Sequence, residues 1–263
     1  MSLMIRSDKN DRIKEVVRLK RKKYRDSEGL FLIEGANLVT EAIRQDWDAE
    51  FFLVSDGAHM DGLREMLEQA APEKTFVVPE RLMEKVSDAQ NGAGVTGVIR
   101  KPVWDLNRFV SSGHSDGNVL ILDRIQDPGN LGTMVRTAAA AGYAGIVALK
   151  GTADVFSLKV LRSTAGMIFQ IPYFTVDTEE EVLDAVRKSG RRLVVTDPRR
   201  GVPYYDADLK RGAALVIGNE GRGISRSLMD VADVRVTIPM ADGVESLNAG
   251  ISAAILMYEA VRG

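Results

Sequence analysis

Apolar and polar positions alternate along the 263-residue chain in two successive series of segments. The first series opens with a helix that Asp11 can cap, because Ile13, Val16 and Val17 follow the 3.6-residue period. Strand-like and helix-like segments then alternate, as expected for a small α/β layer domain of about a hundred residues. Its strands are expected at residues 30–34, 51–55, 75–78 and 95–99, and its helices at residues 36–44, 62–69 and 80–86.

The second series follows a connector that is bracketed by Lys101-Pro102 and the Ser- and Gly-rich stretch 111–117. Strands are expected at residues 119–123, 146–149, 193–196, 214–217 and 234–238, and helices at residues 131–141, 158–162, 180–188, 226–231 and 247–260. These strands are continuous apolar runs, which are typical of parallel strands covered on both faces. The pattern predicts an α/β protein with one domain at 1–103, a linker at 104–116 and a second domain at 117–263.

Composition excludes several chemistries. The chain has no cysteine, which excludes disulfides, thiolate metal sites and a cysteine nucleophile. The two histidines, His59 and His114, show no metal-ligand spacing, so no metal is expected. No apolar run approaches the roughly 18–20 residues of a membrane span. The N-terminus also lacks the apolar core of a signal peptide, so a cytoplasmic location is expected.

The net charge of −2 conceals an uneven distribution. Residues 6–25 hold ten Lys and Arg against three acidic residues, which gives this segment +7 and leaves −9 for the rest of the chain. A basic arm on an acidic protein indicates a polyanionic partner, and a solvated helix face is the alternative. Steps of four, three and four residues place the following cations on one helix face: Lys14, Arg18, Arg21 and Arg25.

Three glycine-punctuated segments each follow a predicted strand of the second series. Residues 123–138 read Asp-Arg-Ile-Gln-Asp-Pro-Gly-Asn-Leu-Gly-Thr-Met-Val-Arg-Thr-Ala, residues 218–225 read Gly-Asn-Glu-Gly-Arg-Gly-Ile-Ser, and residues 238–248 begin Ile-Pro-Met and end Ser-Leu-Asn. Ligands of open α/β sheets bind outside the carboxyl ends of the strands, so these loops are expected to meet at one cleft. Their glycine spacing fits neither G-x-G-x-x-G nor G-x-x-x-x-G-K-[ST], which argues against a dinucleotide site or a P-loop.

Together these segments resemble the three signature motifs of the SpoU (TrmH-like) branch of the SPOUT methyltransferases. The matching positions are Asp127, Pro128, Asn130, Gly132, Arg136, Thr137 and Ala138, then Gly218, Glu220 and Gly223, then Ile238, Pro239, Met240, Gly243, Ser246, Leu247 and Asn248. Residues 161–166 resemble the family's Arg-x-Ser-x-Gly segment, with Thr164 in the serine position, and Ala249 stands where the family usually has valine. Residues 6–100 resemble, more loosely, the ribosomal-protein-L30e-like RNA-binding domain, through Lys22-Lys23-Tyr24-Arg25, Phe31 and Glu34-Gly35.

The resemblance implies an α/β SPOUT fold with a C-terminal trefoil knot and a homodimer. It further implies transfer of a methyl group from S-adenosylmethionine to a ribose 2′-hydroxyl of a structured RNA. An added L30e-like domain suits a large folded target, so ribosomal RNA is expected rather than transfer RNA.

The resemblance and the strand-end positions also imply which residues form the site. The expected catalytic residues are Asn130, Arg136, Glu220, Ser246 and Asn248; the expected cofactor contacts are Thr196, Gly218, Ile238, Met240 and Leu247; and the expected RNA contacts are Lys14, Arg18, Arg21, Arg25 and Arg162. Arg136 is expected to clamp a phosphate rather than act as a base, because an arginine pKa above about 12 makes deprotonation costly. Structural alternatives are a helix-terminal carboxylate for Glu220, helix capping for Ser246 and Asn248, and a surface charge for Arg162.

Three other functions stay open at this point. The chain could be an RNA-binding protein with an inactive methyltransferase domain, a base methyltransferase of another SPOUT branch, or an enzyme of a small metabolite. The intact motif residues argue against the first, and the Ser-Leu-Asn ending argues against the second. The basic N-terminal segment would have no evident purpose in the third.

Overall fold

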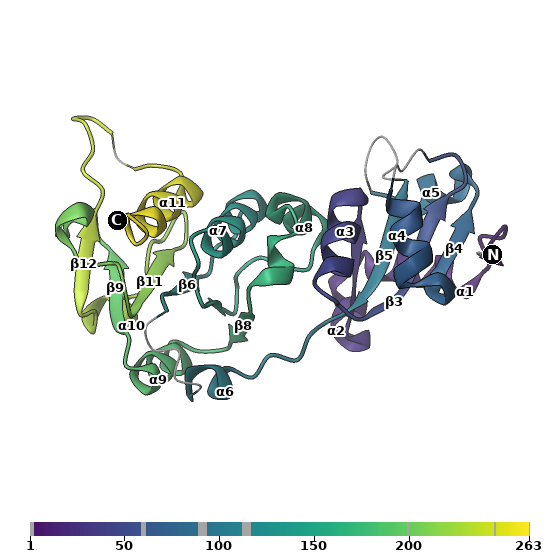
Figure 1. Cartoon of the computed structure of the whole chain (residues 1–263). Coiled ribbons are helices and arrows are strands. Elements are labelled where there is room, and N and C mark those ends of the chain that lie inside the picture. The colour runs from purple at the N-terminus through teal and green to yellow at the C-terminus, as the bar shows by residue number, and fades with distance from the viewer. Residues whose placement is uncertain are drawn as a thin grey trace. The chain divides into compact units, whose positions relative to one another are not determined.

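The computed structural model describes residues 3–58, 62–88, 94–111, 117–198, 200–244 and 246–262 (Figure 1). The chain forms two compact units: unit 1 comprises Met1–Pro102 with Asp154–Phe169, and unit 2 comprises Val103–Ala153 with Gln170–Gly263. No described helix is long and apolar enough to cross a bilayer. His59 and His114, for which no metal role was expected, lie outside the described residues.

Unit 1 is built on a five-stranded mixed sheet with the strand order β1-β4-β3-β5-β2. Strand β5 is antiparallel to β2 and β3, whereas β1 and β3 pair parallel with β4. The elements are β1 (Leu3–Met4), α1 (Asp11–Leu19), α2 (Lys22–Glu28), β2 (Leu30–Glu34), α3 (Ala36–Arg44), β3 (Ala49–Ser55), α4 (Leu63–Ala70), η1 (Pro72–Lys74), β4 (Thr75–Val78), α5 (Glu80–Val86), β5 (Val95–Arg100), α8 (Leu158–Thr164) and η2 (Met167–Gln170, whose last residue belongs to unit 2). The alternating pattern predicted these four main strands correctly.

The basic N-terminal segment forms two helices instead of the single helical face that the sequence predicted. Asn10, not Asp11, caps α1, and the buried positions of α1 are Ile13, Val16 and Leu19. Helix α1 ends at Leu19, and Arg21 has an extended backbone (φ −96°, ψ 129°) before α2 begins. The predicted common face of the four cations is therefore wrong, since the chain changes direction between the second and third of them.

Arg25 is buried rather than exposed, contrary to the expectation of an RNA-facing side chain. One of its terminal nitrogens donates to Asp154 Oδ2 at 2.6 Å, and the other donates to the carbonyl oxygens of Leu19 and Lys20 at 2.8 Å each. The Arg25 side chain is only 7% exposed and that of Asp154 only 15%. Arg25 thus closes the turn between α1 and α2 and binds a distant segment of the chain.

That distant segment, Asp154–Phe169, follows the second series of strands in sequence but packs within unit 1. The rings of Phe156 and Phe31 lie 4.6 Å apart, and Leu158 joins the core cluster of unit 1. The Trp47 Nε1–H donates to the carbonyl of Phe169 at 3.1 Å. The segment therefore contributes part of the core of unit 1.

We expect Arg25→Ala to lower the free energy of unfolding of unit 1 by about 3–5 kcal/mol, because it leaves the largely buried carboxylate of Asp154 and two main-chain carbonyls without their partner. Urea denaturation in a Trp104→Phe background, with Trp47 fluorescence as the reporter, measures this loss. Lys14→Ala is the matched control, since Lys14 forms an exposed ion pair with Asp11 and such pairs contribute little. Equal effects of the two substitutions would contradict the structural role of Arg25.

Unit 2 is built on a seven-stranded sheet with the order β10-β12-β9-β11-β6-β7-β8. All of its pairings are parallel, as the continuous apolar runs predicted. The elements are α6 (Leu106–Ser111), β6 (Val119–Asp123), α7 (Pro128–Ala140), β7 (Gly145–Leu149), β8 (Tyr173–Val176), α9 (Glu179–Ser189), β9 (Arg192–Thr196), β10 (Val202–Pro203), η3 (Tyr204–Asp206), β11 (Ala213–Gly218), α10 (Arg226–Asp230), β12 (Val234–Thr237) and α11 (Ala249–Glu259). The edge strands β8 and β10 were not predicted.

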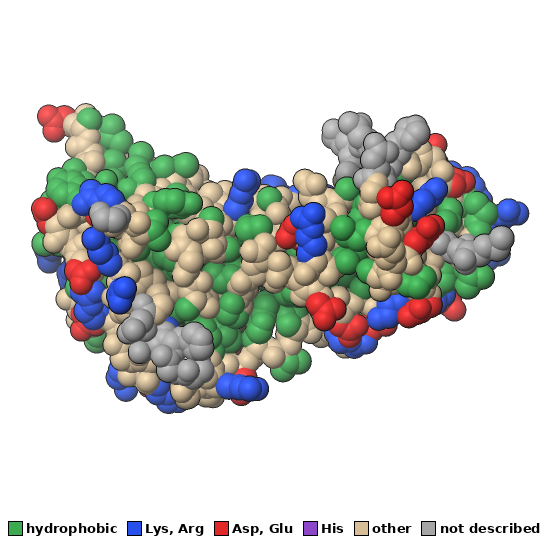
Figure 2. Space-filling model, viewed as in Figure 1, with side chains coloured by type: hydrophobic (Ala, Val, Ile, Leu, Met, Phe, Trp, Pro, Cys, Tyr) green, Lys and Arg blue, Asp and Glu red, His purple; other side chains and the backbone are tan. Residues whose placement is uncertain are grey.

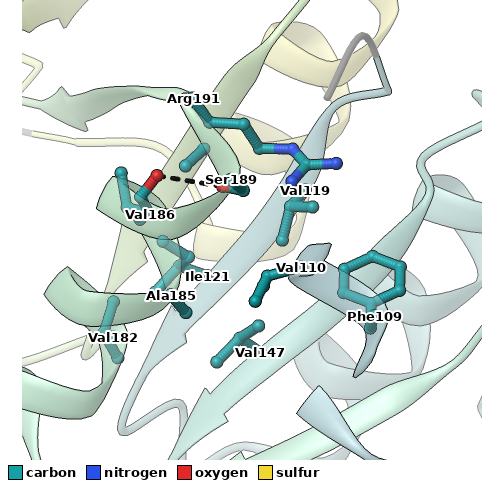
Figure 3. Close-up of a pocket in the computed structure, with 11 residues that line it drawn as sticks. Phe109, Val110, Val119, Ile121, Val147, Val182, Ala185, Val186, Ser189 and Arg191 are labelled. Atoms are coloured by element: carbon teal, nitrogen blue, oxygen red, sulfur yellow. Dashed lines mark hydrogen bonds between the residues drawn. The ribbon is translucent and has the colours of Figure 1, made fainter. Parts of the chain in front are cut away.

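Helices cover both faces of this sheet (Figure 1). Helices α7 and α11 pack against each other on one face, whereas α6, α9 and α10 lie on the other. Helix α6 occupies the stretch that the sequence assigned to a linker, and it packs on α9 within unit 2. Beneath α6 and α9, Phe109, Val147 and Val186 line an interior gap of about 10 Å³ (Figure 3), about the space that a single water needs. The ligand site lies elsewhere.

Candidate active site

Loops at the carboxyl ends of β6, β9, β11 and β12 surround a pocket of about 460 Å³ in unit 2. This volume lies within the usual range of small-molecule sites. Among its lining residues are nine of the residues that the sequence pointed to: Asn130, Thr196, Gly218, Glu220, Ile238, Met240, Ser246, Leu247 and Asn248. The expected meeting of the three glycine-punctuated loops is therefore confirmed.

Helix α7 begins directly at the pocket because its first turn carries a complete cap. The Asp127 side chain accepts the backbone N–H of Asn130 at 2.7 Å, and Pro128 occupies the first helical turn. Leu131 and Met134 are fully buried, which fixes the rotation of the helix on the sheet. Asn130 is consequently 9% exposed, with its amide facing the loop after β11.

Glu220 holds this loop by accepting three hydrogen bonds. The donors are the backbone N–H groups of Gln126 and Asp127 and the Asn130 Nδ2, each at 3.1 Å. Partial burial raises the pKa of Glu220, but the hydrogen bonds from Asn130, Gln126 and Asp127 outweigh it and leave the pKa below its usual value. An ionised carboxylate only accepts, so the Asn130 NH₂ must face Glu220 and its Oδ1 is turned elsewhere. Glu220 thus orients Asn130.

Two further residues, which the sequence did not single out, bind the first loop to the second. The Asn219 Nδ2 donates to the carbonyl of Arg124 at 2.8 Å, and Asp123 Oδ2 accepts the backbone N–H of Ser225 at 2.6 Å. Arg124 has a left-handed backbone (φ 60°) and forms ion pairs with Asp123 and Glu179, each at 2.6 Å. In the sequence, Asp123 and Asn219 are visible only as polar residues at the ends of two predicted strands.

The second loop turns back on itself between Asn219 and Gly223, whose backbones exchange two hydrogen bonds of 2.9 and 3.1 Å. A Cβ on Gly218 would lie 2.4 Å from both the carbonyl carbon of Gly223 and the nitrogen of Ile224. No side chain fits there, since both neighbours are backbone atoms. Glycine at 218 is therefore required by the close approach of the loop to its own strand.

The third loop ends at the cap of α11. The Asn248 side chain accepts the backbone N–H groups of Gly250 and Ile251 at 2.9 and 3.2 Å, so its capping alternative is correct. A Cβ on Gly250 would lie 3.4 Å from Asn130 Oδ1, which shows that the first turns of α7 and α11 are in close contact. Ser246 and Leu247 are exposed on the pocket wall. The pocket thus combines helix N-termini with apolar strand ends.

Arg136 lies two turns along α7, exposed and outside the lining of the pocket. Within the described ranges its guanidinium has no side-chain hydrogen bond or ion pair. All five of its donors are therefore available to a ligand.

The predicted RNA contacts of unit 1 differ in their partners and in their exposure. Lys14 pairs with Asp11 at 3.1 Å and Arg18 with Glu28 at 3.3 Å, whereas Arg21 is exposed. Arg162 lies on α8 and donates to Glu34 Oε2 at 3.2 Å; its side chain is 41% exposed.

Comparison with known families identifies both parts of the chain. Residues 117–258 match the SpoU rRNA Methylase family, and residues 10–97 match the MRM3-like substrate binding domain. The protein belongs to the SpoU rRNA methylase family. Its N-terminal part is thereby identified as a substrate-binding domain, in agreement with the sequence interpretation.

Individual relatives cover nearly the whole chain. The 23S rRNA (guanosine(2553)-2′-O)-methyltransferase RlmP of Bacillus subtilis is 34% identical over 97% of both chains. The 23S rRNA (uridine(2479)-2′-O)-methyltransferase of Streptomyces viridochromogenes is 32% identical over 89% of this chain and 83% of its own length. The AdoMet-bound rRNA methyltransferase of Sinorhizobium meliloti superposes with a TM-score of 0.86 at 30% identity, covering 98% of this chain and 96% of that one.

Proposed function

We propose that this protein transfers a methyl group from S-adenosylmethionine to a ribose 2′-hydroxyl of ribosomal RNA. Residues 1–103 would bind the RNA and residues 117–263 would carry the reaction. The observation that carries this proposal is the Glu220–Asn130 hydrogen bond at the mouth of a 460 Å³ pocket, in a chain whose relatives methylate 23S rRNA. An inactive RNA-binding protein would have no need of that arrangement.

The pocket has the chemistry that S-adenosylmethionine requires. Ile217, Ile238 and Leu247 offer apolar surface for an adenine ring, and Thr196 and Asp197 offer polar groups for hydroxyls or an ammonium. The S. meliloti relative and the SpoU methyltransferase AviRb of S. viridochromogenes have been crystallised with AdoMet. Within the described residues no three or more acidic or histidine side chains gather into a group that could hold a metal ion.

The protein's main task in this reaction is to align the ribose. S-adenosylmethionine supplies a methyl group on a sulfonium that is already a good leaving group. Holding the 2′-hydroxyl in line with that methyl can lower the barrier by up to about 7–11 kcal/mol, whereas a general base typically contributes about 10²–10⁴-fold. Positioning therefore dominates, which suits a site whose loops are held by many hydrogen bonds.

We assign distinct tasks to the residues of the site. The Asn130 Oδ1, turned away from Glu220, can accept a hydrogen bond at the reacting end of the pocket. Arg136 clamps a phosphate of the target nucleotide with its planar fork of donors. Ser246, on the wall of the pocket, contacts the nucleotide, and Asn248 holds the end of α11 beside it.

Isothermal titration calorimetry and methyl transfer in EDTA test this function together. We expect the purified protein to bind S-adenosylmethionine and to methylate unmodified 23S rRNA at the same rate with and without EDTA. Loss of turnover in EDTA and recovery with a divalent ion would contradict the proposed mechanism. RNA binding without cofactor binding would instead support the inactive alternative.

We also propose a homodimer formed through α11. This helix buries Ala253, Leu256 and Met257 against unit 2, yet Ile251 and Tyr258 on its opposite side are 51% and 52% exposed. Hydrophobic side chains gather on the face over α11 (Figure 2). A helix that is apolar on both sides is normally covered on both sides.

Sedimentation equilibrium tests the dimer. The wild type should be dimeric at micromolar concentration, and Ile251→Glu with Tyr258→Glu should be monomeric. Val103→Glu is the matched control, because Val103 is 99% exposed and belongs to no apolar face. A monomeric wild type would contradict the proposal.

Two further properties are proposed, both suggested by the resemblance to the family. We propose that the C-terminal segment forms a trefoil knot; β11 lies between β6 and β9, and α11 returns to α7. An unknotted path in an experimental trace of residues 192–262 would refute it. We place the enzyme in the cytoplasm with its ribosomal substrate, which cell fractionation tests.

A further inference from the structure

Ion pairs divide the ten cations of residues 6–25 into two equal groups. Five of them have a carboxylate partner within 4 Å: Lys14, Arg18, Lys20, Lys22 and Arg25. The other five have no such partner within the described part of the chain: Arg6, Lys9, Arg12, Arg21 and Lys23. The uncompensated positive charge of this segment therefore lies mainly ahead of α1 and in its first turn. The four cations that the sequence placed on one helix face carry less uncompensated charge, since three of them have a carboxylate partner.

Helix α5 adds one further exposed cation, Arg81, to this group. Arg81 donates to the carbonyl of Arg6 at 2.9 Å, and Lys85 pairs with Asp8 at 2.9 Å. Arg81 and Lys85 are four residues apart and share one side of α5, whereas Glu80 and Glu84 lie along its other edge. Asp8 is a carboxylate that lies beside these cations, and its negative charge is offset by the ion pair with Lys85.

Arg12 is held in place by contacts that do not neutralise its positive charge. Its guanidinium carbon lies 4.0 Å from the centroid of the Phe76 ring, and Asn10 caps its backbone N–H at 3.0 Å. A guanidinium stacked on a ring keeps its donors at the edge available to an anion. Because the side chain is already ordered, binding an anion costs it little further conformational entropy.

We propose that Arg6, Lys9, Arg12 and Arg81, here called the N-terminal cation patch, form the surface of unit 1 that docks the phosphate backbone of ribosomal RNA. The inference rests on the proposed function, which supplies the RNA. These four exposed cations, none of them within 4 Å of a carboxylate in the described part of the chain, come from the segment ahead of α1, from α1 and from α5, which packs against α1. Arginine forks match phosphate geometry directly. Lys14 and Arg18, each already beside a carboxylate, contribute less to binding.

Two triple variants with the same change in charge test the patch. One is Arg6→Gln with Lys9→Gln and Arg12→Gln; the matched control is Lys14→Gln with Arg18→Gln and Lys22→Gln, from the same segment. The affinity for unmodified 23S rRNA transcribed in vitro is measured between about 50 and 200 mM salt, where phosphate contacts dominate the salt dependence. Urea denaturation followed by Trp47 fluorescence in the Trp104→Phe background reports on the integrity of unit 1 in each variant.

The patch variant should bind RNA at least about tenfold more weakly at low salt, and its logarithmic salt slope should be shallower by about 2–3. The control should change the slope by less than about 1. Lys9→Glu alone, at an exposed position, should lower affinity even if the triple variant is poorly folded. Arg81→Gln should weaken binding too, because α5 contributes to the surface.

Equal losses in the two triple variants, or a larger loss in the control, would overturn the patch. Unchanged slopes in both, with salt-dependent binding by the wild type, would also overturn it and place RNA docking elsewhere. A wild type that binds 23S rRNA without salt dependence, or not at all, would count against the proposed function itself. These results are distinguishable from one another in a single set of titrations.

Discussion

Arg136→Ala is expected to slow methyl transfer by about 10²–10³-fold, a loss of the size that follows removal of a single hydrogen-bond donor from an enzyme's catalytic site. The S-adenosylmethionine dissociation constant should stay the same, because Arg136 lies outside the lining of the pocket. Single-turnover transfer to 23S rRNA measures the first quantity, and calorimetry measures the second. This pattern separates a residue that positions RNA from one that binds the cofactor.

Two companions make the Arg136 test specific. Arg136→Lys should not restore the rate, because lysine lacks the planar fork that clamps a phosphate. Arg187→Ala is the control, since Arg187 is an exposed arginine of the same unit that, among the described residues, pairs only with its helix neighbour Asp184. If Arg136→Ala lowered the affinity for S-adenosylmethionine and left the affinity for RNA unchanged, our assignment of Arg136 to RNA binding would be wrong.

Gly218→Ala should weaken S-adenosylmethionine binding by about 10²-fold or more, because a displacement of about 1 Å within a site can cost a factor of that order. Its methyl group would lie 2.4 Å from backbone atoms of Gly223 and Ile224. The loop must therefore move away from its strand, and the hydrogen bonds of Glu220 to the first loop would move with it. Calorimetry checks the affinity, and circular dichroism checks that the protein remains folded.

Gly221→Ala is the matched control three residues further on. A Cβ there would meet only Asn219 Oδ1 at 3.7 Å, an ordinary contact, and Gly221 does not have a positive φ. It should bind S-adenosylmethionine as the wild type does. If both alanines were tolerated, the loop would be adaptable, and the rigid positioning that we assign to it would be wrong.

The sequence predicted the catalytic unit well because its signals are local. Continuous apolar runs such as Val119–Asp123 identify parallel strands, and the chain order then brings their carboxyl ends to one edge. The capping alternative for Asn248 is a local signal of the same kind, whereas the start of α7 at Pro128 was missed, since that helix was expected to begin at residue 131. Convergence of the three loops follows from these two kinds of signal. The reaction itself, methyl transfer from S-adenosylmethionine, was inferred from the resemblance of the three motifs to those of the family.

Long-range contacts explain what the sequence could not predict. Arg25 reads as one more surface cation until Asp154, 129 residues away, is placed beside it. The assignment of Asp154–Phe169 to unit 1 likewise depends on partners such as Phe31 and Trp47. Asp123 and Asn219 bind two loops that are distant in sequence. No periodicity records such pairs, since each depends on how separate elements pack.

The most direct test of the central claim is the chemical identity of the product. Unmodified 23S rRNA is incubated with the protein and methyl-labelled S-adenosylmethionine, digested to nucleosides and analysed by mass spectrometry. We predict a single nucleoside that carries the label on its ribose, as a 2′-O-methyl group, and an initial rate of labelling about 10²–10³-fold lower when Arg136→Ala replaces the wild type. Label on a base would contradict the account, as would equal initial rates of labelling by the wild type and the variant.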